Sequence, residues 1–434
     1  MQNFYLIRWL KENSGLDPDI IDSLKFELDN RIYFYGKQFA FPFERSGTRH
    51  ALDTLKYWTK DKIFSPVKKM TSATPSGTLK ISSNAYFQFN KLISQNGFSV
   101  CPVPWQCSGQ CKVERQLLAR VNKVLRFGNF KDLLSAWFAS DILSLKAYFR
   151  AYFKRENIQA LVVPFDMPFF ERLAIKVFKE LNRPSMIALH GLPGRYNSID
   201  DNRADYLLVW GDRIKEYHVR GGIGPDKILV TGHPEYSPAA PQALTVPGKL
   251  RFSLGNILVL SKAMNGAQYS VEEVLTDRGN LILYLYSIRK ILQKNGVKRV
   301  TLRLHPSESV DWYRSFLPGG FFQFDNSPLH NSIARASLVI GPASTVFIES
   351  LIAGVNYLVY EPMLNGRDLL NLPVVPPFDG SEPGIPVANS EEDFQRLLSE
   401  GGAINPSVIP CYIKPSLDLS FIRTVIAKGL GTIA

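Results

Sequence analysis

The sequence is constrained most by a regular alternation of short apolar runs and amphipathic stretches that begins near residue 157. Apolar runs at 160–166, 185–191 and 204–211 have the length of buried strands, and a stretch with helical periodicity at 170–182 separates the first two. Repeated strand–helix–strand units form parallel sheets, which bind ligands beyond the carboxyl ends of their strands. The alternation therefore predicts an α/β protein with a parallel sheet.

A second alternation follows residues 237–253, which are rich in Pro and Ala and show no periodicity. The length of 434 residues also favours two domains, because single cores stop growing near about 250–300 residues. We expect an N-terminal domain over 1–245 that carries a basic elaboration, a C-terminal domain over 250–405, and a tail at 406–434 that crosses back to the first domain. The later strand-like runs are at 256–262, 300–306, 321–325, 337–342 and 356–362.

Positive charge is concentrated at the N-terminal end of the chain. The whole sequence has 51 Lys plus Arg and 39 Asp plus Glu. Residues 1–160 contain 24 of the basic and 13 of the acidic residues, a net charge of +11. Residues 161–434 contain the other 27 basic and 26 acidic residues, a net charge of +1. A basic half combined with a neutral half suggests that one domain meets an anionic partner, such as a membrane surface. Nucleic acid is not expected, since no helix-turn-helix, RNP or zinc-finger signature is present.

A helix is expected at 130–157, where apolar residues recur at steps of three and four. Two interpretations remain open for it: a core-facing helix, or a membrane-surface or acceptor-channel helix with basic residues at one end. Lys146, Arg150, Lys154 and Arg155 are those basic residues.

Cysteine usage and hydropathy give no sign of an exported or membrane-spanning chain. Cys101, Cys107 and Cys111 lack the close pairs of a structural zinc site, which favours reduced thiols. The first 15 residues lack the apolar core and cleavage site of a signal peptide. No stretch offers the roughly 20 mainly apolar residues of a spanning helix. We expect a cytoplasmic protein with at most peripheral membrane contact.

His305 and Pro306 close the apolar run at 300–306. Because proline fixes the turn, the imidazole is expected to point out of the sheet end, where it can donate a hydrogen bond to a phosphate oxygen. Arg303 alternates with His305 along the strand and is expected on the same face. A packed or surface histidine is the alternative interpretation.

The run at 337–342 leads into Gly341-Pro342-Ala343 and then into a helix that starts with Ser344 and Thr345. Backbone N–H groups, the helix dipole and two hydroxyls favour an anion there. A plain N-cap is the alternative for Ser344. The next strand ends at Glu361, a carboxylate that can bind sugar hydroxyls.

The His-Pro pair on a strand, followed 39 and 40 positions later by Ser344 and Thr345, resembles the bacterial CMP-sugar transferases of GT-B fold. These include sialyltransferases, polysialyltransferases and the Kdo transferases of capsule and O-antigen synthesis. The resemblance implies two Rossmann-like domains facing a central cleft, with the CMP phosphate at His305, Ser344 and Thr345. The string VPFDMPFFERLAIKVFKELNRPSMIALHG resembles a block of surface-polysaccharide transferases that often ends in QHG, where this chain has Leu189-His190-Gly191. The later string ILVTGHPEY resembles a following block, in which TGNP is commoner than the Thr-Gly-His-Pro of residues 231–234.

Candidate catalytic residues lie at the strand ends of the first domain. Asp166 is the best placed base or nucleophile, and Glu171 is the runner-up. An N-cap or loop aspartate is the alternative interpretation of Asp166. His190 is expected to hold the acceptor or the donor carboxylate, Arg195 can pair with that carboxylate through two hydrogen bonds, and His233 lies in a matching loop.

The predicted activity is transfer of a 2-keto-3-deoxy acidic sugar (Kdo or a nonulosonic acid such as sialic or pseudaminic acid) from CMP to a lipid-linked or oligosaccharide surface-glycan acceptor. No metal or other cofactor is expected, because no carboxylate cluster with hard-cation spacing stands at a predicted strand end. The basic N-terminal part is expected to meet an anionic membrane, at the inner face of a bacterial inner membrane. The alternatives are a CDP-glycerol or UDP-sugar transferase, a sugar-nucleotide 2-epimerase of the same fold, and a non-catalytic protein.

Overall fold

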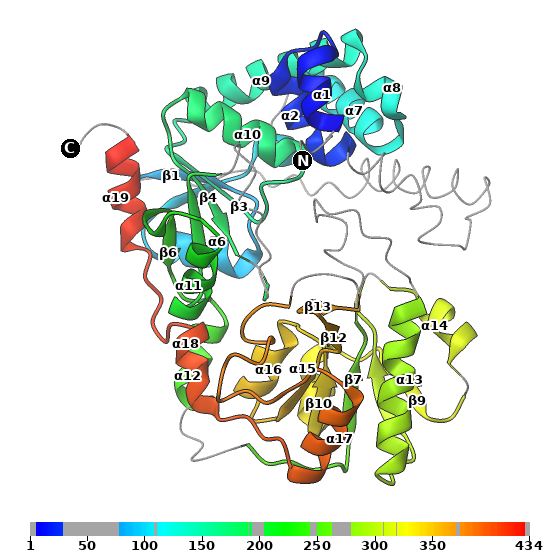
Figure 1. Ribbon diagram of the computed structural model, residues 1–434. Coiled ribbons are helices and arrows are strands. Elements are labelled where there is room, and N and C mark those ends of the chain that lie inside the picture. The colour runs from blue at the N-terminus through cyan, green and yellow to red at the C-terminus, as the bar shows by residue number, and fades with distance from the viewer. Residues whose placement is uncertain are drawn as a thin grey trace. The chain divides into compact units, whose positions relative to one another are not determined.

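The computed structural model describes residues 6–28, 78–107, 111–189, 191–192, 204–243, 250–262, 279–306, 308–317, 319–369 and 374–429 (Figure 1). The chain divides into two compact units. The first comprises Met1–Ala188, Asp200–Leu207 and Leu419–Ala434, and the second comprises Leu189–Ile199 and Leu208–Asp418. The domain boundaries expected from the sequence remain a prediction.

One six-stranded sheet has the order β2-β1-β3-β4-β5-β6. Its strands are β1 (Lys80–Ser83), β2 (Ser99–Cys101), β3 (Ala160–Val163), β4 (Ser185–Ala188), β5 (Tyr206–Val209) and β6 (Ile228–Val230). The first four run parallel, with Ile81 paired to Val100 on one side and to Ala160 on the other. The chain therefore leaves β1 in one direction to form β2 and in the other to form β3, so the strand order reverses between β1 and β3.

Aromatic side chains form much of the core of the first unit. Helix α9 begins after Ser135, whose hydroxyl accepts the Phe138 N–H at 3.3 Å and caps the helix. Its buried Phe153 packs edge-on against Phe178 of α10, with ring centroids 4.6 Å apart. The helices of this unit are α1 (Leu6–Asn13), α2 (Pro18–Ser23), α6 (Phe87–Gln95), α7 (Lys112–Phe127), α8 (Phe130–Leu133), α9 (Ala136–Arg155), α10 (Phe169–Glu180) and α19 (Ser420–Gly429).

The second unit contains a six-stranded sheet of order β14-β11-β10-β7-β8-β9, in which all neighbouring strands run parallel. Its strands are β7 (Ile257–Leu260), β8 (Val300–Arg303), β9 (Phe322–Phe324), β10 (Leu338–Gly341), β11 (Tyr357–Tyr360) and β14 (Val387–Ala388), and a hairpin pairs β12 (Met363–Leu364) with β13 (Arg367–Asp368). Strands β7, β8 and β9 follow one another in one direction, whereas β10, β11 and β14 extend from β7 in the other. The strand order therefore reverses between β7 and β10.

Helices on the second sheet bury a continuous apolar core. Tyr284 of α13 stacks on Tyr360 of β11 at 5.4 Å, and Tyr360 stacks in turn on Phe394 of α17 at 4.5 Å. The helices of this unit are α11 (Asp212–Arg220), α12 (Tyr236–Ala243), α13 (Gly279–Lys294), α14 (Val310–Phe316), α15 (Leu329–Arg335), α16 (Val346–Ile352), α17 (Glu391–Glu400) and α18 (Ile409–Tyr412).

The predicted α/β class is confirmed, together with the two parallel sheets that the GT-B resemblance implies. Two local expectations are corrected. The stretch 237–253, the candidate linker between the two domains, shows no periodicity in its sequence, but most of α12 lies in it. The single helix expected at 130–157 is divided into α8 and α9 at Leu134 and Ser135, because the Ser135 hydroxyl starts a new helix. Among the described residues, no helix is both long and apolar enough to cross a membrane.

Candidate functional site

Polar residues gather where the strand order of the second sheet reverses. Ser261 and Lys262 follow β7 directly, the segment Pro342–Thr345 follows Gly341 at the end of β10, and His305 comes two residues after β8. Ligands of open parallel sheets bind in the crevice beyond the carboxyl ends of the strands, at such a reversal. The elements thus bring together residues that lie up to 84 positions apart (345 minus 261) in the sequence.

Glu308 fixes the turn that carries His305. The Glu308 N–H donates to the His305 carbonyl at 2.9 Å, and the Glu308 carboxylate accepts hydrogen bonds from the hydroxyls of Ser261 and Tyr313, the latter at 2.8 Å. The His305 N–H donates to Ser261 Oγ at 3.1 Å. The imidazole is exposed, and desolvation by neighbouring protein atoms lowers its pKa. A neutral imidazole has one N–H donor and one acceptor nitrogen.

The turn after β10 packs closely against the Tyr357 side chain of β11. A Cβ atom at Gly341 would lie 2.3 Å from the Tyr357 hydroxyl oxygen, so only glycine fits. That hydroxyl donates to the Pro342 carbonyl at 2.6 Å. Ser344 Oγ accepts the Val346 N–H at 3.3 Å, and Thr345 Oγ1 accepts the Leu192 N–H at 2.8 Å. The Thr345 side chain therefore joins the start of α16 to the segment that follows Gly191.

A buried group of charges lies beneath this turn. Lys262 forms ion pairs with Glu361 and with Asp368, the latter at 3.0 Å. The second Glu361 oxygen accepts the Ala343 N–H at 2.7 Å. Glu361 is 0% exposed, and its two oxygens are used by Lys262 and by the turn. The structure thus places Glu361 under the site, where it connects the ends of β7, β10 and β11.

The side chains of Arg303 and His233 are both bound by other protein groups. Arg303 was expected on the same face as His305. The Arg303 guanidinium donates to the Ser327 carbonyl at 2.6 Å and contacts Asp325 at 3.3 Å, so it holds the loop after β9. His233 Nδ1 accepts the N–H groups of Glu235 and Tyr236, both at 3.2 Å. Burial lowers the pKa of His233 to about 3. His190 and Arg195 lie outside the described residues.

Asp166 and Glu171 lie in the first unit, at the point where the strand order of its sheet reverses. Asp166 follows the end of β3 by three residues and is 7% exposed. Glu171 is in the first turn of α10, and its carboxylate accepts a hydrogen bond from Asn84, which directly follows β1, at 2.7 Å. Burial raises the pKa of Glu171. A carboxyl with a raised pKa at a sheet end has the properties of a general acid or base.

Several residues of the second-unit site were missed in the sequence. They are Ser261, Lys262, Glu308, Tyr313 and Asp368. A signal was present for Ser261 and Lys262, because they are the first polar residues after an apolar run at a predicted strand end. No comparable signal marks Asp368, which reaches Lys262 through the β12–β13 hairpin. Among the described residues, no three His, Cys, Asp or Glu side chains are placed to hold a metal ion together.

The chain is similar in structure to several solved proteins, among them glycosyltransferases. For the MnaA–UDP co-structure of S. aureus, the similarity covers 82% of this chain and 97% of that one, with 11% identity and a TM-score of 0.44. For a glycosyltransferase from Rickettsia africae, the similarity covers 82% of this chain and 100% of that one, with 13% identity and a TM-score of 0.47. For the lipopolysaccharide outer core galactosyltransferase WaaB, it covers 82% of this chain and 100% of that one, with 11% identity and a TM-score of 0.43. No protein-family model matches the sequence, and neither does any curated protein sequence.

Proposed function

We propose that the chain is a glycosyltransferase that transfers a 2-keto-3-deoxy acidic sugar from CMP to a surface-glycan acceptor. One observation carries the proposal: the His305 turn, Ser261 and the Gly341–Thr345 turn meet where the strand order reverses between β7 and β10. The resemblance of the His-Pro and Ser-Thr motifs to CMP-sugar transferases supports CMP as the donor nucleotide.

The leaving group in this proposal is CMP, whose single phosphate gains charge as the bond to the sugar breaks. The imidazole of His305 and the hydroxyl of Ser344 would donate hydrogen bonds to that charge, the kind of stabilisation that fixed donors provide in a transition state. Glu308 and Ser261 support it by fixing the His305 main chain. With one phosphate to neutralise, the proposed reaction is independent of a metal ion and is expected to persist in a chelator.

Asp166 is the proposed base that takes the proton of the acceptor hydroxyl, and Glu171 is the alternative. Both are carboxylates beside the reversal of strand order in the first sheet. Burial raises the pKa of Glu171, which supports a role in proton transfer. The variants Asp166→Asn and Glu171→Gln distinguish the two candidates, because only replacement of the base should abolish sugar transfer.

An anionic acceptor or membrane is the proposed partner of the basic N-terminal part. Helix α7 supports this, because its exposed face carries five cations and its sequence has one acidic residue, Glu114. The exposed Phe127 ends the same helix, and Arg126 lies over its ring at 6.0 Å. The cations are Lys112, Arg115, Arg120, Lys123 and Arg126.

Donor cleavage tests this proposal. The purified full chain is incubated with CMP-Kdo, CMP-sialic acid and a UDP-hexosamine, with and without chelator. Water takes the place of the acceptor hydroxyl, so the products measured are the released nucleotide and the free sugar. CMP release that Asp166→Asn or Glu171→Gln abolishes and that chelator leaves unchanged is expected. UDP release without CMP release would instead favour a UDP-sugar transferase, and isomerised UDP-sugar would favour an epimerase.

A further inference from the structure

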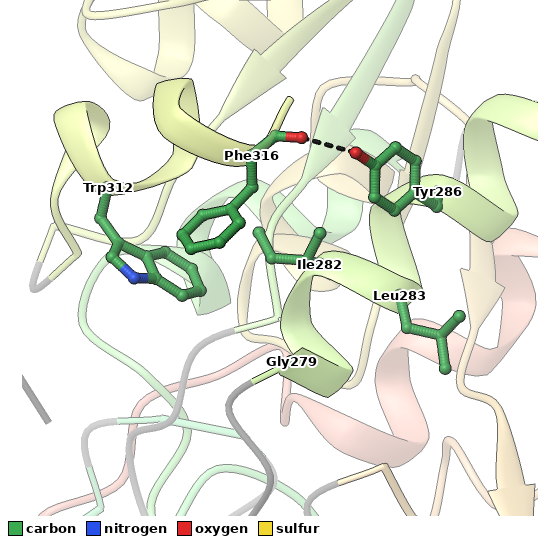
Figure 2. A pocket seen from close by; sticks show the side chains of 6 residues that line it. All are labelled: Gly279, Ile282, Leu283, Tyr286, Trp312 and Phe316. Carbon is green, nitrogen blue, oxygen red and sulfur yellow. Dashed lines mark hydrogen bonds between the residues drawn. The ribbon is translucent and has the colours of Figure 1, made fainter. Parts of the chain in front are cut away.

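The second unit has an apolar groove between α13 and α14, separate from the residues assigned to nucleotide. It has a volume of about 500 Å³, and Figure 2 shows Leu283 and Tyr286 on one wall and Trp312 and Phe316 on the other. The Tyr286 hydroxyl donates to the Phe316 carbonyl at 2.6 Å, which fixes the two walls together. The remaining lining residues are Gly279 and Ile282.

Three large apolar side chains of this groove are exposed to water. Leu283 is 54% exposed, Phe316 47% and Tyr286 40%. The opposite side of α13 is already buried in the core, so the first two turns of the helix are apolar on nearly every side. Helices of that composition are normally covered on all sides, and clustered exposed apolar residues mark sites of interaction.

The exposed face of α13 changes from apolar to basic along its length. Positions 283, 286, 290 and 294 recur at spacings of three and four and therefore share one face. Lys290 and Lys294 are exposed and occupy the later half of that face. The sequence from Gly279 to Val300 contains five cations and no acidic residue. Acidic groups on packed elements are Glu391 and Glu392 of α17, the first of which pairs with Lys290 at 2.7 Å, and Asp311 of α14, which pairs with Arg314 at 3.3 Å.

We propose that the α13–α14 groove docks on the anionic leaflet of a phospholipid bilayer. Leu283, Tyr286 and Phe316 enter the boundary between acyl chains and headgroups, and Lys290 and Lys294 contact lipid phosphates. An anionic membrane is favoured as the partner because its negative charge complements Lys290 and Lys294. These lysines continue the apolar face of α13, as basic residues do on helices that lie in a membrane interface. Aromatic side chains such as Tyr286 favour that depth of the bilayer. The proposal is independent of the donor nucleotide.

Flotation of the full chain with vesicles tests the proposal without any sugar donor. Vesicles of phosphatidylcholine alone are compared with vesicles that also contain phosphatidylglycerol, at low and high salt. The wild-type chain is expected to bind the anionic vesicles, and Leu283→Gln with Phe316→Gln to weaken binding at least about tenfold. Leu364→Gln is the matched control, because Leu364 is 78% exposed on β12. It should bind like the wild type.

The basic half is tested separately. Lys290→Gln with Lys294→Gln is expected to weaken binding about fivefold for each lysine, whereas the exposed pair Lys179→Gln with Lys227→Gln should leave it unchanged. Wild-type binding in the Leu283 and Phe316 double variant, or no vesicle binding by the wild-type chain, would overturn the proposal. A wild-type dimer that the same double variant dissociates, measured by sedimentation, would also overturn it, because the groove would then join two copies of the chain.

Discussion

Lys262 and Glu361 form an ion pair inside the second unit, with 6% and 0% of their side chains exposed. Removing one partner leaves an uncompensated buried charge, which costs about 3–5 kcal/mol. Lys262→Met is therefore expected to lower the free energy of unfolding in urea by about that amount. Lys290→Met is the matched control, because it removes an ion pair whose lysine is 74% exposed, and it should have little effect. Equal small effects of both variants would contradict the role assigned to Lys262.

Glu308 is expected to act on nucleotide binding through His305. Glu308→Ala removes the acceptor for the Ser261 and Tyr313 hydroxyls, so the His305 turn loses its support. CMP affinity measured by calorimetry should fall about tenfold, the value of one hydrogen bond to a charged group. Glu308→Gln keeps one carbonyl oxygen and should recover part of the loss. Unchanged affinity in Glu308→Ala would show that the turn is positioned by other contacts.

His233 predicts a dependence of stability on pH. Its pKa is about 3 in the folded chain against a usual 6.5, so the unfolded chain binds the extra proton between these values. The stabilisation from neutral His233 is thus present above pH 6.5 and is lost as the pH falls from 6.5 towards 3. His233→Asn keeps a side-chain oxygen for the Glu235 and Tyr236 N–H groups. In urea unfolding, the fall in stability from pH 7 to pH 5 should be smaller in this variant; an identical fall would refute the assignment.

The stability contributed by Glu171 is expected to depend on pH in the direction opposite to that of His233. Burial raises its pKa in the folded chain, so folding favours the protonated carboxyl, and stability is lost as the pH rises through the folded value. Glu171→Gln keeps an acceptor for Asn84 and carries no charge. Its free energy of unfolding should exceed that of the wild type at pH 8 and match it at pH 4. A variant less stable than the wild type at pH 8 would show that the ionised carboxylate is favourable at this position.

The regular part of the fold was predictable from the sequence because buried parallel strands produce continuous apolar runs. The runs at 160–166, 256–262 and 337–342 each contain an observed strand, β3, β7 and β10. Strands β1 and β2 were not found, since Lys80–Ser83 and Ser99–Cys101 are short and mostly polar or small. Strand β1 pairs with β3 through residues about 80 positions apart, such as Ile81 with Ala160, and β2 pairs in turn with β1. No local sequence pattern contains these contacts.

Site residues were predictable where a strand end and a turn residue coincide, as at His305-Pro306 and Gly341-Pro342. What those side chains contact was not predictable. Glu361 ends a strand as expected, yet its carboxylate is enclosed by Lys262 and the Ala343 N–H. Arg303 alternates with His305 as expected, yet its guanidinium binds the Asp325 loop. Such partners come from other elements, and their identity depends on three-dimensional packing.

The proposal as a whole depends on nucleotide binding at the reversal between β7 and β10. Calorimetric titration of the full chain with CMP, CDP and UDP tests it directly, with His305→Ala as the probe variant. His330→Ala, an exposed histidine on α15, is the matched control. We expect CMP to bind more tightly than UDP, at least about tenfold weaker CMP binding in His305→Ala, and unchanged binding in His330→Ala. Binding of UDP alone, or CMP binding that His305→Ala leaves unchanged, would contradict the account.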